Sequence, residues 1–286
     1  MRPSINRRWY SHLFLTIFLC LIGASLPAYS APDSEGSNAS TPTAIPPEKT
    51  RPILQGNVEH SESLPSLDES LRPGEKYREE ALLKMGTAAN NDWFWIPSWY
   101  AGKRHTEDAL IVYRYDFNTG ITTTPMQRQL ERQNSVSGYQ QDRNGEIWDF
   151  KNIPFIQHID SGAVLAVLYI KEMTPMVVNR SQMVLKYEEI SITYEPKSHK
   201  ILDVVQQEQI NTISPMPPDG LRADISVKSF GWDGKPERAE QSVVFSKMIE
   251  PYHRIDTLDD KDLRSMFRDY LMANKLANLV PEDLTN

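Results

Sequence analysis

Strand-like runs of apolar residues follow one another between residues 109 and 248. Apolar and polar residues alternate with a period of two in most of them, at 109–117, 146–150, 183–194, 201–210, 223–227 and 239–248. Residues 163–170 are apolar at every position, which predicts a central strand covered on both faces. Short turn sequences separate the runs, and Asn144-Gly145 ahead of one run is a strong hairpin signal. No helical pattern lies between the runs. The sequence therefore predicts a mainly β domain over 91–286, built as an antiparallel up-and-down meander.

One of these runs changes phase. Apolar residues occupy odd positions from 183 to 187 and even positions from 190 to 194. The change falls at Glu188-Glu189 and predicts a β-bulge there. Two adjacent carboxyls would suit general acid–base chemistry, but neighbours in a strand point to opposite faces. We favour a solvated pair of acids at a bulge.

Helical spacing appears before and after the β runs. Residues 75–90 are rich in strong helix formers and predict a short helix. A second helix is expected at about 257–278, with Thr257 and Asp260 forming an approximate capping box and Pro281 ending it. Its apolar face should pack on the sheet. That face comprises Leu263, Met266, Phe267, Tyr270 and Leu271.

Residues 1–30 have the three parts of a secretory signal peptide. Arginines stand at positions 2, 7 and 8, an apolar run covers 13–24, and Ala28-Tyr29-Ser30 provides small residues before a cut at Ala31. The apolar run is shorter than the roughly 20 residues that span a bilayer. We therefore predict export and no stable membrane span after cleavage.

Residues 31–74 are rich in Pro, Ser and Glu and contain almost no aromatic residues. Such a composition buries too little apolar surface to offset the loss of conformational entropy on folding. This segment is predicted to be a disordered tether.

Cleavage would also change the chemistry of the chain. It removes Cys20, the single cysteine, and it removes three arginines and no acid, so the formal net charge falls from −7 to −10. A disulfide-free exported protein fits a bacterial periplasm or extracellular space better than a eukaryotic secretory route. The acidity and the lack of a basic patch argue against nucleic acid as a partner.

The passage Trp93-Phe94-Trp95-Ile96-Pro97-Ser98-Trp99-Tyr100-Ala101-Gly102 is the most distinctive in the chain. An aromatic and glycine entry, a meander and a terminal helix resemble the lipocalin or calycin β-barrels. The resemblance implies a tryptophan that plugs the closed end of a barrel and an interior for a small apolar ligand. Where the lipocalin signature has Gly-x-Trp, this chain has Gly102-Lys103-Arg104, with Trp99 upstream. A strongly curved open sheet or a two-sheet sandwich fits the pattern nearly as well.

Residue chemistry favours binding over catalysis. The histidines are scattered without metal-ligand spacing, no nucleophile motif is evident, and no cofactor is expected. The first hypothesis is an exported, non-enzymatic domain that binds a small apolar molecule. The alternatives are an envelope interaction or assembly factor acting through its surface and tether, and an unrecognised hydrolase. The candidate ligand or partner contacts are Trp93, Trp95, Trp99, Tyr100, Arg104, Tyr113 and Trp148.

Overall fold

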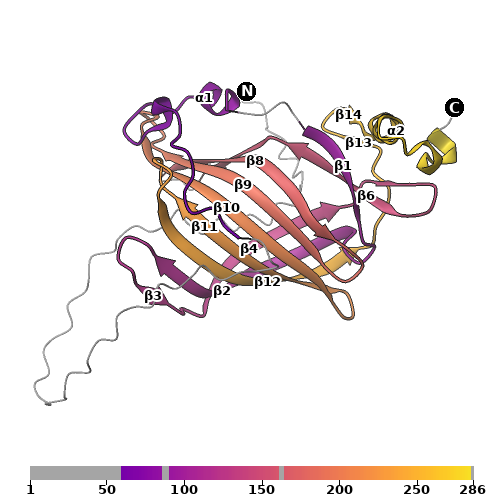
Figure 1. Ribbon diagram of the computed structural model, residues 1–286, viewed down its shortest axis with the longest axis horizontal. Coiled ribbons are helices and arrows are strands. Elements are labelled where there is room, and N and C mark those ends of the chain that lie inside the picture. Colours follow the sequence, from indigo (N-terminus) through magenta and orange to yellow (C-terminus); the bar gives the residue numbers. More distant parts are fainter. Residues whose placement is uncertain (1–58, 86–89, 161–163, 285–286) are drawn as a thin grey trace, which may run out of the picture.

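A computed structural model describes residues 59–85, 90–160 and 164–284. The predicted signal peptide and residues 31–58 of the predicted tether lie outside the described residues. The mainly β, antiparallel meander is confirmed (Figure 1). The main sheet has the strand order β3-β2-β12-β11-β10-β9-β8-β7, and β4 also pairs with β2. Its strands are β2 (Gly102–Asp116), β3 (Thr122–Thr123), β4 (Gln127–Ser137), β7 (Phe155–Asp160), β8 (Leu165–Val178), β9 (Met183–Tyr194), β10 (Ile201–Met216), β11 (Gly220–Phe230) and β12 (Pro236–Glu250).

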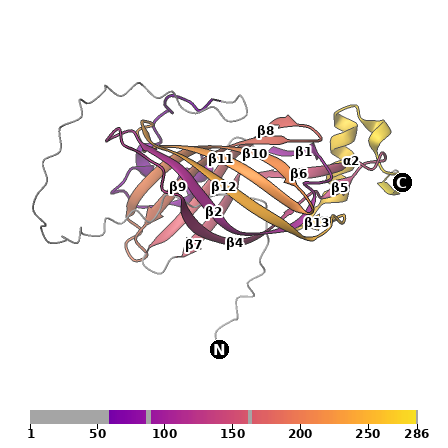
Figure 2. The same ribbon diagram turned by 90° about the horizontal axis from the view of Figure 1, so that it is seen from below.

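The main sheet curves strongly, as Figures 1 and 2 show. The curvature brings Ala109 of β2 and Leu168 of β8 into one apolar core, although these strands lie far apart in the sheet order. We call the face that carries these two residues the concave face and the opposite one the convex face. Within the described residues the edge strands β4 and β7 do not pair with each other, so the sheet is a strongly curved open sheet and not a closed barrel.

Strand β9 is regular, and the bulge expected at Glu188-Glu189 lies in its neighbour. Glu188 and Glu189 pair in unbroken register with β10, whereas β8 inserts Lys171 opposite them. The apolar pattern changes phase because each face of β9 is covered at a different end. Odd residues are buried on the concave face near 185, and even residues are buried on the convex face near 192.

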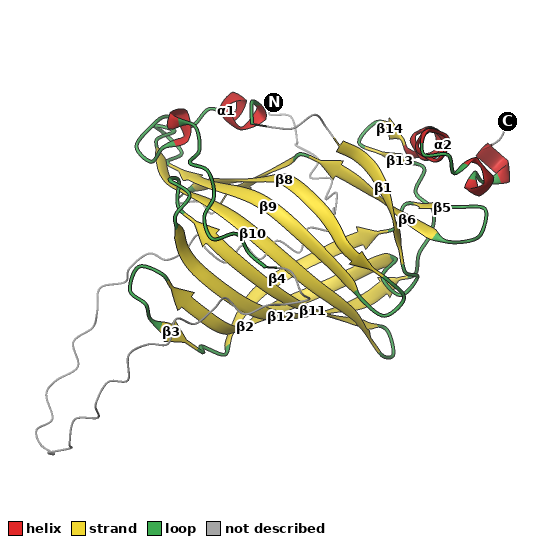
Figure 3. Cartoon of the chain, in the orientation of Figure 1, coloured by secondary structure: helices red, strands yellow, loops and turns green. Residues whose placement is uncertain are grey.

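A small second sheet covers one end of the concave face. It has the order β1-β6-β5, formed by β1 (Asn90–Ile96), β6 (Ile147–Ile153) and β5 (Gln140–Gln141) (Figure 3). Strands β5 and β6 form the hairpin that Asn144-Gly145 predicts. We call this unit the end sheet. One of its faces joins the main core through Ile96, Ile147 and Ile153.

The predicted C-terminal helix packs on the other face of the end sheet. This helix, α2 (Leu263–Ala273), buries Leu263, Phe267 and Leu271. It is shorter than 257–278, and the capping prediction was wrong. Thr257 belongs to a hairpin of β13 (Thr257–Leu258) and β14 (Lys261–Asp262), because the intervening Asp259 and Asp260 both take positive φ. Asp262 caps the helix instead, accepting bonds from the backbone N–H of Arg264 and Ser265.

The helix ends before Pro281 because Lys275 adopts a left-handed conformation (φ 61°). The N–H of Leu276 then donates to the carbonyl of Leu271 at 2.8 Å, as in a Schellman motif. Two short 3-10 helices follow, η2 (Ala277–Leu279) and η3 (Glu282–Leu284). No helix in the described part of the chain is both long and apolar enough to cross a bilayer.

Residues 59–74, expected in the disordered tether, lie instead along the main sheet. Leu64 and Leu67 donate backbone hydrogen bonds to Gly234 and Trp232, at 2.9 and 3.0 Å. The segment continues through η1 (Glu69–Leu71) and α1 (Glu79–Leu83). Helix α1 is shorter than the helix expected at 75–90: residues 75–78 precede it, β1 begins at Asn90, and residues 86–89 lie outside the described residues. A few spaced apolar residues suffice for this order because the convex face offers them an apolar surface. The buried members of this cluster are Leu71, Tyr77, Leu82, Val167, Tyr169, Ile190, Ile192, Tyr194, Ile201 and Val204.

Candidate ligand-binding site

Glu189 stands in the middle of the concave face. In register it lies between Ile170 of β8 and Gln207 of β10. Its side chain is only 3% exposed, and neither carboxyl oxygen has a hydrogen-bond partner. Burial raises the pKa of Glu189 to about 8, so the carboxyl is mostly protonated at neutral pH.

Buried amides continue from Glu189 along β10. Gln207 Nε2 donates to Ser229 Oγ at 3.2 Å, and Gln209 Nε2 donates to Asn211 Oδ1 at 2.9 Å. These polar groups lie on the same face because they occupy alternate positions of one strand. They form a polar belt beside Glu189 without contacting its carboxyl.

An ion pair completes the belt on β2 and β12. Arg114 and Glu240 are opposite each other in register, and their side chains approach to 2.6 Å. Burial raises the pKa of Glu240, while its contact with Arg114 opposes that rise. Further along the same two strands, Arg238 lies across from Asp116. The belt therefore matches its arginines with acids and leaves Glu189 without a counter-ion.

Apolar side chains flank the polar belt on the concave face. On the side of Glu189 away from the end sheet lie Leu168 and Val205. On the side towards the end sheet lie Leu185, Ile225 and Val227. All five are buried. A surface of this kind, mostly apolar with a few placed polar groups, is typical of sites for small organic ligands.

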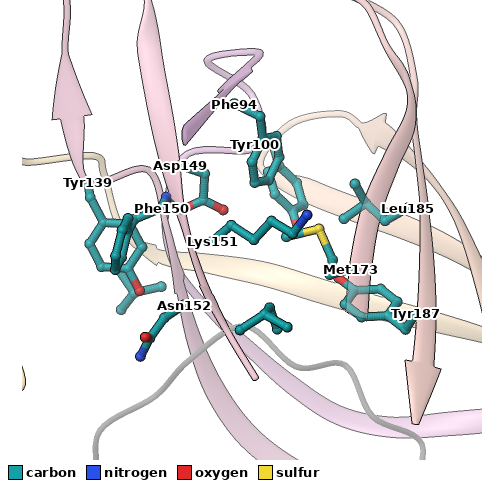
Figure 4. Close-up of a pocket in the computed structure, with 12 residues that line it drawn as sticks. Phe94, Tyr100, Tyr139, Asp149, Phe150, Lys151, Asn152, Met173, Leu185 and Tyr187 are labelled. Carbon is teal, nitrogen blue, oxygen red and sulfur yellow. Dashed lines mark hydrogen bonds between the residues drawn. The ribbon is translucent and has the colours of Figure 1, made fainter. Parts of the chain in front are cut away.

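Two small cavities open where the concave face meets the end sheet. Each has a volume of about 30 Å³, and both are lined by Tyr100 and Tyr187. That volume holds about two water molecules, given roughly 10–15 Å³ for each. Figure 4 shows the first cavity, where Lys151 of β6 extends towards Tyr100 and Met173.

Asp149 of the end sheet lies at this first cavity. It is 7% exposed, and its Oδ1 accepts the backbone N–H of Gly138 at 2.9 Å and of Phe150 at 3.2 Å. Burial raises the pKa of Asp149 to about 7, and the two backbone hydrogen bonds limit the rise. The residue holds the end sheet to the end of β4 and also supplies a second titratable carboxyl inside the protein.

Arg104 lines the second cavity. Its guanidinium is buried and donates to the backbone carbonyls of Trp99, Tyr100 (3.5 Å) and Asp219 (3.3 Å). Burial lowers the pKa of Arg104. These bonds tie the turn before β2 to the loop between β10 and β11, so the arginine closes this end of the concave face.

The structure brings only two of the seven sequence-predicted contacts to the cavities, namely Tyr100 and Arg104. Trp93 and Trp148 are buried on the α2 side of the end sheet, and Trp95 on that side donates to Glu146. The other two lie elsewhere: Trp99 Nε1 donates to the Arg180 carbonyl at 2.7 Å, and Tyr113 pairs with Gln241 on the convex face.

Sequence reasoning noticed Glu189 but placed it in solvent. The available signal was the alternation itself, because Glu189 has the same parity as Leu185 and Tyr187. No histidine lines either cavity: His105 contacts Asn134, and His158 lies 3.1 Å from Glu79 of α1. Within the described ranges, no cluster of three or more potential metal ligands is present.

Comparisons with protein-family models, with curated proteins and with solved structures found no match for this chain.

Proposed function

We propose that this chain is an exported, non-enzymatic binding protein that holds a small, largely apolar molecule on the concave face of its sheet. The observation that carries the proposal is Glu189, a carboxyl that is buried and has no partner. Burying a polar group without a hydrogen bond is unfavourable by a few kcal/mol. A site that binds a polar group of a ligand explains why such a residue is kept there.

The surroundings of Glu189 support the same function. Apolar residues lie on both sides of it along the face, as a hydrocarbon body requires, and the belt supplies a few hydrogen-bonding groups. The sheet is open between β4 and β7, so its curvature is not fixed by a closed ring of hydrogen bonds. A molecule larger than the two cavities can enter only if the curvature of the sheet changes, and the open edges permit such a change.

Fluorescence titration of the mature chain, residues 31–286, with the apolar probe N-phenyl-1-naphthylamine tests the proposal. We expect saturable binding with one probe per chain. Val227→Phe, which fills the concave face beside the polar belt, should weaken binding at least tenfold. Val243→Phe on the convex face of the adjacent strand is the matched control and should bind normally.

Thermal unfolding of both variants establishes that they are folded, and Gln209→Leu provides a second concave-face variant. Native mass spectrometry of protein purified from its own host should also show a co-purified small molecule. The proposal fails if the wild type binds no probe and carries no small molecule. It also fails if the folded concave and convex variants lose binding equally.

A further inference from the structure

We propose that Glu189 recognises a primary ammonium group, so that the ligand is an amine carried on an apolar body. This inference rests on the proposed function, because it names the polar group of the molecule held on the concave face. The carboxyl that would receive the amine is 3% exposed and has two unpartnered oxygens.

No cationic side chain among the described residues is hydrogen-bonded to Glu189. Arg114 is engaged by Glu240 at 2.6 Å, and Arg104 by three backbone carbonyls. Lys171 and Lys186 contact Glu188 and Glu208 on the convex face. Lys151 of the end sheet lines the first cavity but makes no hydrogen bond to either carboxyl oxygen of Glu189. A ligand ammonium would therefore provide the missing positive charge.

The charge of an ionised Glu189 selects against an anionic ligand. A carboxylate placed beside it would bring two negative charges together in a buried site, where like charges repel strongly. An alcohol would avoid this repulsion but would bring no charge. An ammonium has three N–H donors for the two free carboxyl oxygens, and a charge-assisted hydrogen bond is about twice as strong as a neutral one.

Recognition of an ammonium predicts a proton-linked reaction. The buried Glu189 has a pKa of about 8 and is mostly protonated at pH 7. It must ionise to pair with the cation, so binding transfers its proton to the buffer. The described titratable and charged groups that face this region come from four elements and the turn before β2. They are Tyr187 of β9, Arg238 and Glu240 of β12, Arg104, Arg114 and Asp116 of β2, Asp149 and Lys151 of the end sheet, and Tyr100. β8 places only Ile170 opposite Glu189, and the position opposite on β10 is Gln207.

Isothermal titration calorimetry with octylamine, 1-octanol and octanoate tests the proposal, using mature protein at pH 7. We expect octylamine to bind at least tenfold more tightly than octanol, and octanoate to bind most weakly. Titrations in phosphate and in Tris, which differ in ionisation enthalpy, give the number of protons released from the difference in the observed binding enthalpy. They should show release of about 0.9 proton per octylamine, the protonated fraction for a pKa of about 8. Octanol should release none.

Glu189→Gln should abolish this proton release and lower octylamine affinity at least tenfold, while octanol affinity stays the same. Glu172→Gln, at an exposed position of β8, is the control and should behave as the wild type. Equal affinity for octylamine and octanol, or octylamine binding without proton release, overturns the ammonium site and leaves the binding function standing. Tighter octanoate binding also overturns it. Failure of all three molecules to bind overturns the proposed function as well.

Discussion

Glu188 and Glu189 are neighbours in β9, and their carboxyls lie on opposite faces of the sheet in opposite chemical states. Glu188 is 3.1 Å from Lys171 on the convex face, whereas Glu189 is buried on the concave face with no partner. Strand alternation alone produces this separation. It makes one residue an ordinary surface ion pair and the other an acid that resists ionisation.

The first prediction concerns the pH dependence of stability. The pKa of Glu189 is about 8 in the folded chain and near its usual value of 4.5 in the unfolded chain. Between these pH values the unfolded state binds fewer protons, so the free energy of unfolding falls as pH rises, by up to about 1.4 kcal/mol per pH unit. Glu189→Gln should remove this slope, and urea unfolding from pH 5 to pH 8 measures it.

Over that range the variant should gain stability relative to the wild type, on the order of 4 kcal/mol. Asp149 also loses protons near pH 7, but it is present in both proteins and cancels in the comparison. Glu188→Gln is the adjacent control and should change stability by less than about 1 kcal/mol at any of these pH values. A parallel pH profile for wild type and Glu189→Gln would contradict the assignment.

The second prediction concerns Gly138, which joins β4 to the end sheet. It has φ +81°, and a Cβ there would lie 2.7 Å from Ile147 Cγ2. Gly138→Ala should therefore lower the free energy of unfolding by about 2–4 kcal/mol, through backbone strain and overpacking together. Gly145 has a similar φ of +84°, but its nearest neighbour would be 3.7 Å away. Gly145→Ala should lose only the backbone part, about 1–2 kcal/mol. If chemical denaturation gives the same loss of unfolding free energy for both variants, the contact with Ile147 does not contribute to the cost of Gly138→Ala.

The third prediction concerns the attachment of residues 59–67 to the convex face. Glu208 is 1% exposed and accepts the backbone N–H and the hydroxyl of Ser61, both at 2.7 Å, as well as Lys186 Nζ at 2.8 Å. Burial alone would raise the pKa of Glu208. Contacts with His60, Lys186 and Ser61 instead hold it well below its usual range.

A lowered pKa adds stability above the unfolded value and loses it as pH falls through the folded value. Glu208→Gln should therefore detach this segment at pH 7. We expect amide hydrogen exchange of residues 60–67 to accelerate at least tenfold, while β9 and β10 remain protected. Glu195→Gln, at an exposed turn position, should exchange as the wild type does. Unchanged exchange in Glu208→Gln would show that the apolar contacts hold the segment without the carboxylate.

The fourth prediction concerns the contact between α2 and the end sheet. Phe267 is fully buried, with ring centroids 4.8 Å from Trp93 and 5.8 Å from Trp148. Phe267→Ala should reduce the free energy of unfolding by about 3–5 kcal/mol. Tryptophan emission should shift to the red as water reaches the two indoles. Met272→Ala, at a 57% exposed site on the same helix, should alter stability by less than about 0.5 kcal/mol. Similar losses in both variants would contradict a dominant role for the packing of Phe267 on the two tryptophans.

The spacing of apolar residues predicted the strands of the meander, with a period of two, and the apolar face of α2, with spacings of three and four residues, because both follow from local periodicity. The prediction of a bulge in β9 was wrong because both faces of this strand are covered, each at a different end. The phase change at Glu188-Glu189 is a change in which face is covered, and that depends on residues more than 100 positions away in sequence, such as Leu71. Strand order and the pairing of bulges with neighbouring strands are likewise non-local.

The candidate site was harder to predict than the fold. Aromatic residues attracted attention because they are large, yet Trp93 and Trp148 serve the packing of α2. The informative residue, Glu189, looked like a surface acid, since most glutamates are exposed. The parity that Glu189 shares with Leu185 and Tyr187 was the local signal, and the register of β9 between β8 and β10 establishes that its side chain enters the interior.

An open sheet leaves two strand edges that could recruit a strand from another molecule. The β7 edge has α1 beside it, with His158 3.1 Å from Glu79. The β4 edge is polar, because residues 127–129 and 132–135 are all glutamine, arginine, asparagine or serine. Charged and amide side chains on an edge disfavour intermolecular strand pairing. The open sheet therefore leaves two edges whose side chains disfavour the addition of a strand from another molecule.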